Sequence, residues 1–248
     1  MTTRGGKTVF GASVGILMLN TRFPRIPGDI GNAATWPFPV HYKVIPAATP
    51  DNVVRGDATP LLGAFIDAGR ELLELGCDGI ATNCGFLVPF QTEMSRALGV
   101  PVASSSLLQA PLIRMSLPTD QTLGILTISS ETLTTAHLDA AGIPHDTPVG
   151  GTGAGSHFTT RVLGNADEID FDQARADNVN AALRLVHDNP NIGAILLECT
   201  NMVPYAADIR RATGRPVFSI YTYLLWFQAG LLPRRFPTHL DDIPWAPS

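Results

Sequence analysis

Two segments of this 248-residue chain, 115 positions apart, share a pattern of residues. The first is ATNCGFLVPF, residues 81–90, and the second is LLECTNMVPY, residues 196–205. At this offset Cys84 corresponds to Cys199, and a Val-Pro-aromatic triplet follows in both copies. The likeness continues to a Gly-x-Pro-Val motif that ends at Val102 in the first copy and at Val217 in the second. Such a repeat predicts two lobes of similar topology.

Short apolar runs alternate with helical patterns in both halves of the chain. Strand patterns cover residues 13–19, 39–45, 78–84, 100–106, 122–128, 192–199 and 215–221, and helical patterns cover residues 61–76 and 176–188. A further helix is expected to open at Pro89, because proline is favoured in a first helical turn. Strands that alternate with helices predict a parallel sheet.

We therefore predict an α/β fold of two pseudo-symmetric lobes, residues 1–118 and 119–248, each with a parallel sheet flanked by helices. The C-terminal segment could pack back on the first lobe. Ligands of open parallel sheets bind beyond the carboxyl ends of the strands, so the active site is expected in the cleft between the lobes. The alternative is that buried strands of many α/β proteins look alike because they use the same few residues.

Composition narrows the class of function. With 45% apolar and 16% charged residues, the chain is typical of a packed globular protein. A net charge of −5 without a dense basic run disfavours nucleic acid and membranes as partners and favours a small molecule. The apolar run at residues 8–19 is shorter than a membrane span and is followed by no cleavage site, and three cysteines suit a reducing compartment, so we expect a cytoplasmic protein.

Cys84 and Cys199 each end an apolar strand and precede a predicted helix. A helix N-terminus can lower the pKa of a thiol and provide thiolate at neutral pH. If the lobes face each other, one thiolate can remove a proton from a carbon while the opposite thiol delivers one, which inverts the stereocentre. The simpler interpretation is that a free cysteine is a small buried hydrophobe. We adopt that for Cys77, which has no counterpart in the second half. The six histidines are scattered, so we expect no metal site.

The cysteine-bearing strand ends TNCG and ECTN, together with GILMLNTRFPRIPGDIGN at residues 15–32, resemble the aspartate/glutamate racemase superfamily. That superfamily contains cofactor-independent amino-acid racemases, hydantoin racemases, arylmalonate decarboxylases and maleate isomerases. The resemblance implies two α/β lobes with the active site between them, no pyridoxal phosphate or other cofactor, and catalytic roles for Cys84 and Cys199. The usual racemase pattern has Asn-Thr after the first cysteine, whereas Gly85 follows it here.

The resulting expectation is an isomerase, a racemase of amino acids such as aspartate or glutamate. Both cysteines are present, whereas the decarboxylases of this superfamily keep one, which favours racemisation. The alternatives are a hydantoin racemase, an enzyme like arylmalonate decarboxylase or maleate isomerase, and, from another class, a two-lobed small-molecule binding protein. A homo-oligomer is also considered.

Without a cofactor, the carbanion has to be stabilised by donors placed around the substrate carboxylate. Polar residues at strand ends can supply them, although the same residue types also cap helices. The candidates for substrate binding are Asn20, Thr21, Asn83, Gly85, Ser129, Ser130, Thr200 and Asn201.

Four further features are left open by the sequence. Arg22 or Arg25 could bind a second carboxylate of the substrate, or both could belong to a solvated loop. Glu198 should point away from Cys199 if the strand remains extended, but could tune the thiol if the strand ends early. The segment Gly150–Ser156 lacks the spacing of a phosphate-binding loop and is interpreted as a mobile loop beside the cleft, followed by a surface histidine, His157. The Pro-rich tail, residues 232–248, is expected to wrap the surface or a neighbouring subunit.

Overall fold

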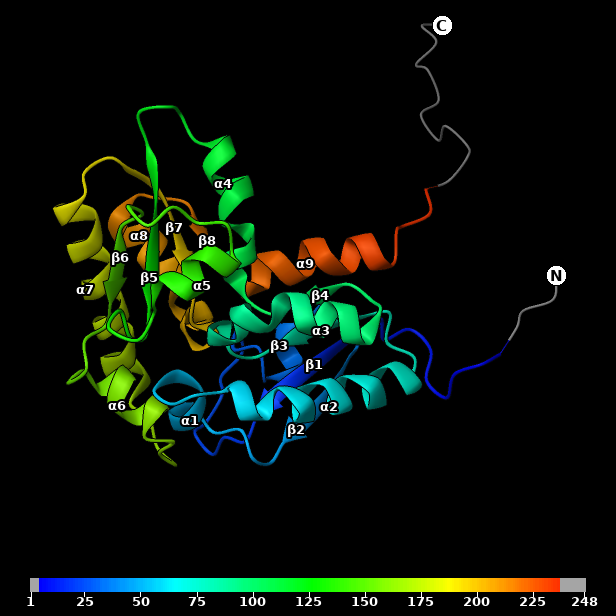
Figure 1. Ribbon diagram of the computed structural model, residues 1–248. Helices are drawn as coiled ribbons and strands as arrows, with labels where there is room; N and C mark the ends of the chain where they lie inside the picture. Colours follow the sequence, from blue (N-terminus) through cyan, green and yellow to red (C-terminus); the bar gives the residue numbers. More distant parts are fainter. Residues whose placement is uncertain (1–4, 237–248) are drawn as a thin grey trace, which may run out of the picture.

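The computed structural model describes residues 5–236, which contain two parallel four-stranded sheets (Figure 1). The first sheet has the order β2-β1-β3-β4, with β1 (Val14–Leu19), β2 (Val40–Ile45), β3 (Gly79–Thr82) and β4 (Val102–Ala103). The second has the order β6-β5-β7-β8, with β5 (Thr122–Thr127), β6 (Val149–Gly151), β7 (Ile192–Leu197) and β8 (Val217–Phe218). The two orders are equivalent, so the predicted α/β fold with two parallel sheets is confirmed.

The helices flank the two sheets and connect their strands. The first half contains α1 (Pro50–Val54), α2 (Leu62–Glu74) and α3 (Gln91–Leu98), and α4 (Ala110–Ser116) leads to the second half. The second half contains α5 (Thr135–Ala140), α6 (His157–Leu163), α7 (Phe171–Asp188), α8 (Ala206–Thr213) and α9 (Ile220–Leu231). Short 3-10 helices are η1 (Ala33–Thr35), η2 (Thr59–Leu61), η3 (Gly85–Phe90), η4 (Ser106–Gln109) and η5 (Thr200–Tyr205).

The central strands are buried on both faces, as helices on both sides of a parallel sheet require. Every residue of β1, β3 and β7 is buried. The boundary between residues 118 and 119 stays a prediction, but all strands of the first sheet precede it and all strands of the second follow it.

Helix α9 follows the second sheet in the chain but packs on the first. Its Leu224 and Phe227 belong to the same buried cluster as Val14 and Ile16 of β1. A Cβ atom on Gly79 of β3 would lie 2.6 Å from Leu231 and 2.9 Å from Phe227, so this glycine permits the close approach of the helix.

The sequence-based prediction of a strand through residues 215–221 is wrong in its second part, because the strand ends at Phe218. Ser219 then caps α9: its hydroxyl accepts from the N–H of Tyr221, and its own N–H donates to the hydroxyl of Thr222, which completes a capping box. The predicted strand at residues 100–106 is similarly reduced to Val102–Ala103, because Ser105 caps η4. The helix expected at Pro89 is also displaced: Pro89 lies inside η3, and α3 begins at Gln91.

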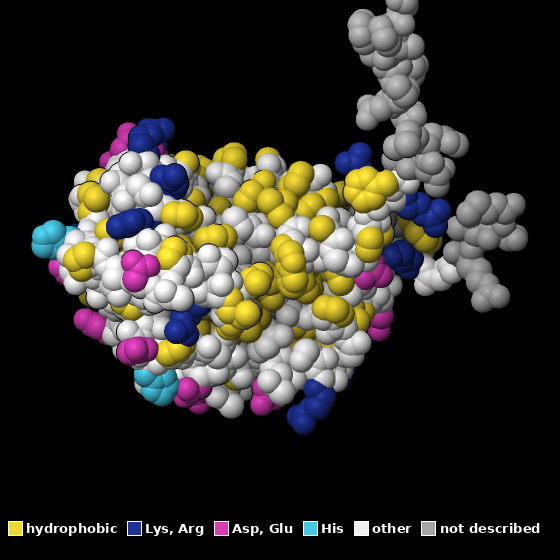
Figure 2. Space-filling model, turned by 90° about the horizontal axis from the view of Figure 1, so that it is seen from above, with side chains coloured by type: hydrophobic (Ala, Val, Ile, Leu, Met, Phe, Trp, Pro, Cys, Tyr) yellow, Lys and Arg dark blue, Asp and Glu magenta, His cyan; other side chains and the backbone are white. Residues whose placement is uncertain are grey.

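Exposed hydrophobic side chains gather on the face formed by α4 and α9, seen from above in Figure 2. Met115 is 86% exposed, and Leu112 and Trp226 are each 64% exposed. The expected self-association stays a prediction. No helix within residues 5–236 is long and apolar enough to cross a membrane. Most of the tail that was expected to wrap the surface, residues 237–248, lies outside the described residues.

Candidate active site

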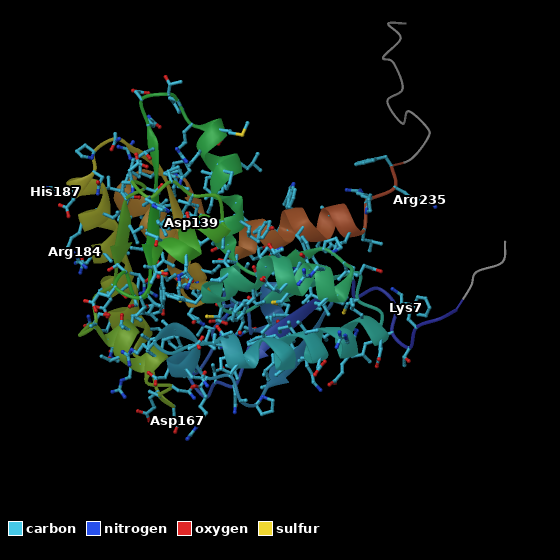
Figure 3. All side chains as sticks on the ribbon, viewed as in Figure 1. Lys7, Asp139, Asp167, Arg184, His187 and Arg235 are labelled. Atoms are coloured by element: carbon cyan, nitrogen blue, oxygen red, sulfur yellow. The ribbon has the colours of Figure 1, made fainter. Side chains whose placement is uncertain are left out.

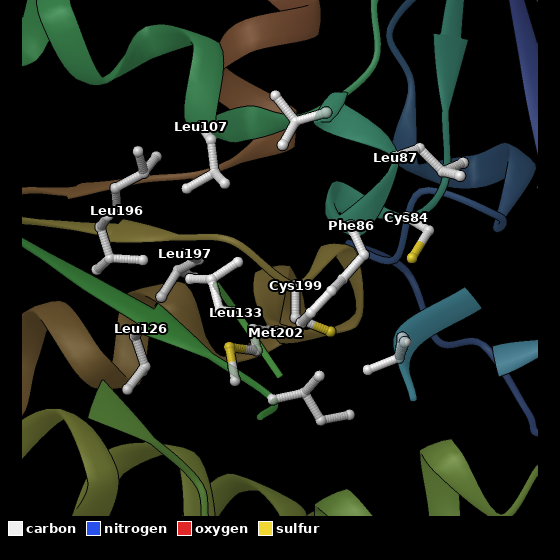
Figure 4. Packing of buried hydrophobic residues seen from close by; sticks show 14 of the residues in the cluster. Cys84, Phe86, Leu87, Leu107, Leu126, Leu133, Leu196, Leu197, Cys199 and Met202 are labelled. Carbon is white, nitrogen blue, oxygen red and sulfur yellow. The ribbon is translucent and has the colours of Figure 1, made fainter. Parts of the chain in front are cut away.

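The repeat brings the two cysteines to equivalent places at the carboxyl ends of β3 and β7. Cys84 is the N-cap residue of η3, and Cys199 is the N-cap residue of η5. Both sulfur atoms point into the same space, and the ring of Phe86 runs from η3 towards Cys199 (Figure 4). The two thiols also lie within electrostatic reach of each other. The structure therefore places both predicted catalytic residues in one site.

The local structure around each cysteine is the same in both halves. After each 3-10 helix comes an eight-residue helix, α3 or α8, that ends at a left-handed glycine, Gly99 with φ 67° and Gly214 with φ 70°. Only a residue without a side chain adopts this conformation at little cost. The backbone N–H two residues beyond each cysteine, that of Phe86 or Asn201, bonds to the sulfur atom. The similar sequences thus produce matching surroundings for the two thiols.

The two thiols line a small cavity. Its volume of about 30 Å³ is enough for about two water molecules. Most of its wall is apolar and is formed by Leu19, Phe23, Pro50, Val54, Phe86, Ile128, Val162 and Leu163. Pro50 and Val54 of α1 and Val162 and Leu163 of α6 come from segments that the sequence analysis did not connect with the site, and only the tertiary structure brings them to it.

Seven of the ten predicted site residues line this cavity: Cys84, Cys199, Thr21, Asn83, Gly85, Thr200 and Asn201. Asn20, Ser129 and Ser130 do not line it. The exposed side chain of Asn20 donates to the carbonyl of Pro46. The carbonyl of Ser129 accepts from the hydroxyl of Thr132 and the N–H of Leu133 in the turn that precedes α5. The hydroxyl of Ser130 lies against Gly151 of β6.

Two of the polar residues beside the cysteines hold the halves together. The side chain of Asn83 accepts from the N–H of Leu19 at 2.8 Å, which fixes the ends of β1 and β3. The hydroxyl of Thr200 donates to the carbonyl of Asn83 at 2.7 Å and so links the second half to the first. Ser106 makes a comparable link by donating to the carbonyl of Leu197 at 2.7 Å. These groups position the strand ends that carry the thiols.

Arg25, and not Arg22, reaches the cavity. Its guanidinium bonds to Asp29 at 2.6 Å and to the hydroxyl of Thr21 at 2.9 Å. The other carboxylate oxygen of Asp29 accepts from the side chain of Asn201 at 2.7 Å. Arg25 also stacks on Phe23, with 4.5 Å from Cζ to the ring centroid. In contrast, Arg22 pairs with Asp167 at the edge of the molecule (Figure 3).

Glu198 is a buried residue in the wall of the cavity, and only 1% of its surface is exposed. Strand β7 ends at Leu197, before Glu198. This is the early strand end for which the sequence analysis allowed Glu198 to influence the thiol of Cys199. One carboxyl oxygen, Oε2, accepts from Thr127 at 2.7 Å, while Oε1 has no hydrogen-bond partner within residues 5–236. Burial raises the pKa of Glu198 to about 7, and the bond from Thr127 offsets part of that rise.

The expectation that the thiol pKa values are lowered is wrong. Burial, and then the nearby Glu198, raise the pKa of Cys84 to about 12 and the pKa of Cys199 well above its usual value. The N–H bonds to the two sulfurs act in the opposite direction but are weaker than the loss of hydration. Arg25 lowers the pKa of Cys84, whereas Asp29 raises that of Cys199, so Cys84 has the more favourable surroundings for a thiolate.

Cys77 lies outside the cavity, in the buried segment that follows α2. His157 accepts from the N–H of Asp170 and does not line the cavity either. The segment Gly150–Ser156 is only partly a loop, because Gly150 and Gly151 belong to β6 and Ser156 caps α6. Within the described part of the chain, no group of three or more His, Cys, Asp or Glu residues is arranged to hold a metal ion.

The raised pKa of Glu198 makes the stability of the fold depend on pH. Since the unfolded carboxyl titrates near 4.5 and the folded one near 7, the folded state keeps its proton longer, and stability falls as pH rises between these values. The expected loss is about 3 kcal/mol. Urea unfolding at pH 5 and pH 8 should show that Glu198→Gln lacks this loss, while the exposed control Glu131→Gln keeps it. A pH dependence in Glu198→Gln equal to that of the unchanged protein would contradict the assignment.

Gly85 provides the space that the Glu198 carboxyl group occupies. A Cβ atom at Gly85 would collide with Oε1 of Glu198 and lie 2.7 Å from the carbonyl oxygen of Glu198. Because that carbonyl is backbone and cannot turn aside, we expect Gly85→Ala to lower the free energy of unfolding by about 1–3 kcal/mol. Gly63→Ala, in an open position of α2, should instead be neutral or slightly stabilising. Denaturant unfolding of both variants checks this, and equal stability of the two would contradict the crowding.

No protein-family model matches the chain. Curated proteins similar to most of its sequence are dimethylsulfoniopropionate lyases. One, from Durusdinium sp. clade D, is 28% identical over 94% of this chain and 80% of its own length. Another, dimethylsulfoniopropionate lyase 6 from Emiliania huxleyi strain CCMP1516, is 30% identical over 94% of this chain. The chain spans 63% of the length of that relative.

Solved structures with a similar fold come from the racemase and decarboxylase group. A variant of arylmalonate decarboxylase superposes with a TM-score of 0.58 and 16% identity, covering 88% of this chain and 92% of its own. The glutamate racemase RacE1 of Bacillus anthracis superposes with a TM-score of 0.56 and 12% identity, covering 89% of this chain and 84% of its own. At these identities the likeness shows the fold alone, which is the fold that the cysteine motifs indicated.

The expectation of an amino-acid racemase, and with it the isomerase class and a role in amino-acid metabolism, is wrong. The relatives that match nearly the whole chain in sequence are lyases that act on dimethylsulfoniopropionate, whereas the racemases share only the fold. The sequence motif indicated the fold but not the reaction.

Proposed function

We propose that this protein is a lyase that eliminates dimethyl sulfide from dimethylsulfoniopropionate. The observation that carries the proposal is the similarity to dimethylsulfoniopropionate lyases over 94% of the chain. The site is compatible with it, because the reaction begins with removal of a proton from the carbon next to a carboxylate. Two thiols that face one cavity are suited to that step.

The elimination balances without a cofactor. A thiolate takes a proton from the α-carbon, and the electron pair of that C–H bond forms the double bond between the α- and β-carbons. The bond from the β-carbon to sulfur breaks, and its electron pair leaves with dimethyl sulfide. The products are acrylate, dimethyl sulfide and one proton, which is held by the thiol before it reaches solvent. The positive sulfonium is already a good leaving group, so no added electrophile is needed.

We assign the base to Cys84, because Arg25 favours its thiolate and no acidic residue other than Glu198 opposes it. Cys199 keeps its proton and can donate to the carboxylate as this group takes on enolate character. The high pKa of the buried thiol has a chemical advantage, since a thiolate of high pKa is the stronger base. The disadvantage of the high pKa is that the thiol loses its proton only when a positive charge nearby stabilises the thiolate.

Arg25 is the proposed receptor for the substrate carboxylate. It is the one cation among the residues that line the cavity in the described structure. A guanidinium carries five N–H donors, and the bonds to Asp29 and Thr21 leave others for a ligand. Asp29 and Phe23 hold the guanidinium plane in place, which favours a fixed orientation of the carboxylate.

The test is a substrate panel with the purified full chain. Dimethylsulfoniopropionate, aspartate, glutamate and a hydantoin are incubated separately, and dimethyl sulfide in the headspace and optical rotation of the amino acids and hydantoin are followed. We expect release of dimethyl sulfide from the first compound and no change in rotation of the others. Inversion of an amino acid or hydantoin without release of dimethyl sulfide would overturn the proposal.

A further inference from the structure

We propose that Glu198 is a specificity-determining residue that recognises the positive onium group of the substrate. This inference rests on the proposed function and extends it, because it names the group that selects a cationic leaving group. It concerns a residue that the two-thiol chemistry does not use. The ligand class is a carboxylate with an onium centre on its β-carbon.

The charged residues around the cavity favour the binding of a cation. Of the residues that line it, only Arg25 and Glu198 carry a formal charge. Arg25 is already neutralised by Asp29 at 2.6 Å, whereas Glu198 makes no ion pair in the described structure. A buried carboxylate without a counter-ion is costly. A ligand that brings a positive charge would remove that cost.

The hydrogen bonds of Glu198 leave one oxygen for such a ligand. Oε2 is fixed by Thr127, and Oε1 is buried against Gly85 with no hydrogen-bond partner among the described residues. The neighbouring wall is apolar and includes Phe86, whose ring can contact the methyl groups of an onium centre. An onium group with methyl substituents donates no N–H bond, so a carboxylate oxygen and an aromatic ring are suitable contacts for it.

Arg25 and Glu198 both line the cavity, so a zwitterion can pair one charge with each of them once the cavity widens beyond its present room for about two water molecules. Cys84 lies within electrostatic reach of both residues. A substrate with its carboxylate at Arg25 and its onium group at Glu198 would place the carbon atoms between the two charges near Cys84. The onium charge would then also favour the thiolate, so that the base becomes available when the substrate is bound.

The test compares two inhibitors that have the same carboxylate and similar shape but differ in charge. One is 3-(trimethylammonio)propanoate, which is cationic at the β-substituent, and the other is 4-methylpentanoate, the neutral carbon counterpart of dimethylsulfoniopropionate. Their dissociation constants are measured by calorimetry with the full chain, with Glu198→Gln and with Glu131→Gln, which removes the same charge from an exposed position. Circular dichroism establishes that each variant is folded.

We expect the unchanged protein and Glu131→Gln to prefer the cationic inhibitor. In Glu198→Gln the affinity for the cationic inhibitor should fall by about tenfold or more, while that for 4-methylpentanoate changes little. If Glu198→Gln does not fold, Thr127→Val is used instead. This variant removes the hydrogen bond that favours the charged form of Glu198, so it should weaken the preference for the cationic inhibitor. Equal loss for both inhibitors, or an unchanged preference, would overturn the inference.

Failure of this inference can be told from failure of the proposed function. Turnover of dimethylsulfoniopropionate with an unchanged inhibitor preference in Glu198→Gln would overturn the role of Glu198 alone. A preference that depends on Glu198, without turnover of dimethylsulfoniopropionate, would overturn the proposed reaction and retain the recognition of onium carboxylates.

Discussion

Replacing Cys84 by serine is expected to reduce kcat/KM for dimethylsulfoniopropionate by about 10²–10⁴-fold, the usual contribution of a general base. A serine hydroxyl fills the same position but ionises far less readily than a thiol. Cys199→Ser should cost less, about tenfold, because a hydroxyl can replace a thiol as a hydrogen-bond donor to the enolate. Initial rates of acrylate formation measure both effects.

The unequal response separates elimination from racemisation. A racemase that uses two bases needs both thiols for inversion and should lose activity similarly with either replacement. Cys77→Ser is the matched control, since this cysteine is buried but lies outside the cavity. It should leave kcat/KM nearly unchanged. Full activity of Cys84→Ser would show that Cys84 is not the base.

Arg25→Leu is expected to lower both stability and activity strongly. The side chains of Arg25 and Asp29 are only 10% and 5% exposed, so loss of the arginine leaves a buried carboxylate without its partner. Breaking such a pair costs about 3–5 kcal/mol. Asn201 is anchored on the same carboxylate, so the surroundings of Cys199 should also change.

The double variant Arg25→Leu/Asp29→Asn distinguishes the structural role of Arg25 from binding of the substrate. Removing the unpaired charge should restore much of the stability in urea unfolding, but KM should stay high because the carboxylate receptor is absent. Arg22→Leu is the control: its pair with Asp167 is 69% and 64% exposed, so its loss should cost at most about 1 kcal/mol and leave KM unchanged. Recovery of a normal KM in the double variant would show that Arg25 does not bind the substrate.

The repeat at an offset of 115 was sufficient to predict the two equivalent sheets and the common location of Cys84 and Cys199. It succeeded because each copy contains a complete local unit, from the end of a buried strand through the 3-10 helix to the left-handed glycine. Asn83 and Asn201 reach the cavity because they lie near these strand ends, and Thr21 reaches it from the end of the neighbouring strand β1.

The remaining features depend on tertiary contacts that no local pattern contains. Val54 of α1 and Val162 of α6 reach the cavity from segments far from either cysteine. The direction of Glu198 depends on the end of β7 at Leu197, two residues before the predicted strand pattern ends. Ser129 and Ser130 follow β5, yet the turn after this strand directs them to α5 and β6 rather than to the cavity.

The two thiols do not distinguish racemisation from elimination, because they indicate only the proton removal that both reactions share. Both reactions remove a proton next to a carboxylate, and the fate of the resulting carbanion depends on the substituent at the β-carbon. The residue that we propose to bear on this difference is Glu198. Among the described residues that line the cavity Arg25 is the one cation, and it already pairs with Asp29, so a second substrate carboxylate has no cation to bind. That charge distribution suits a zwitterion better than aspartate or glutamate.

The most direct test of this account is a proton NMR experiment in D2O with the full chain and dimethylsulfoniopropionate. The signals of acrylate, dimethyl sulfide and the α-protons of the remaining substrate are followed together, with Cys84→Ser alongside. The account predicts that acrylate and dimethyl sulfide appear in equal amounts, and that Cys84→Ser forms both at least about a hundredfold more slowly. Absence of acrylate, or formation of acrylate at the same rate by Cys84→Ser, would contradict it.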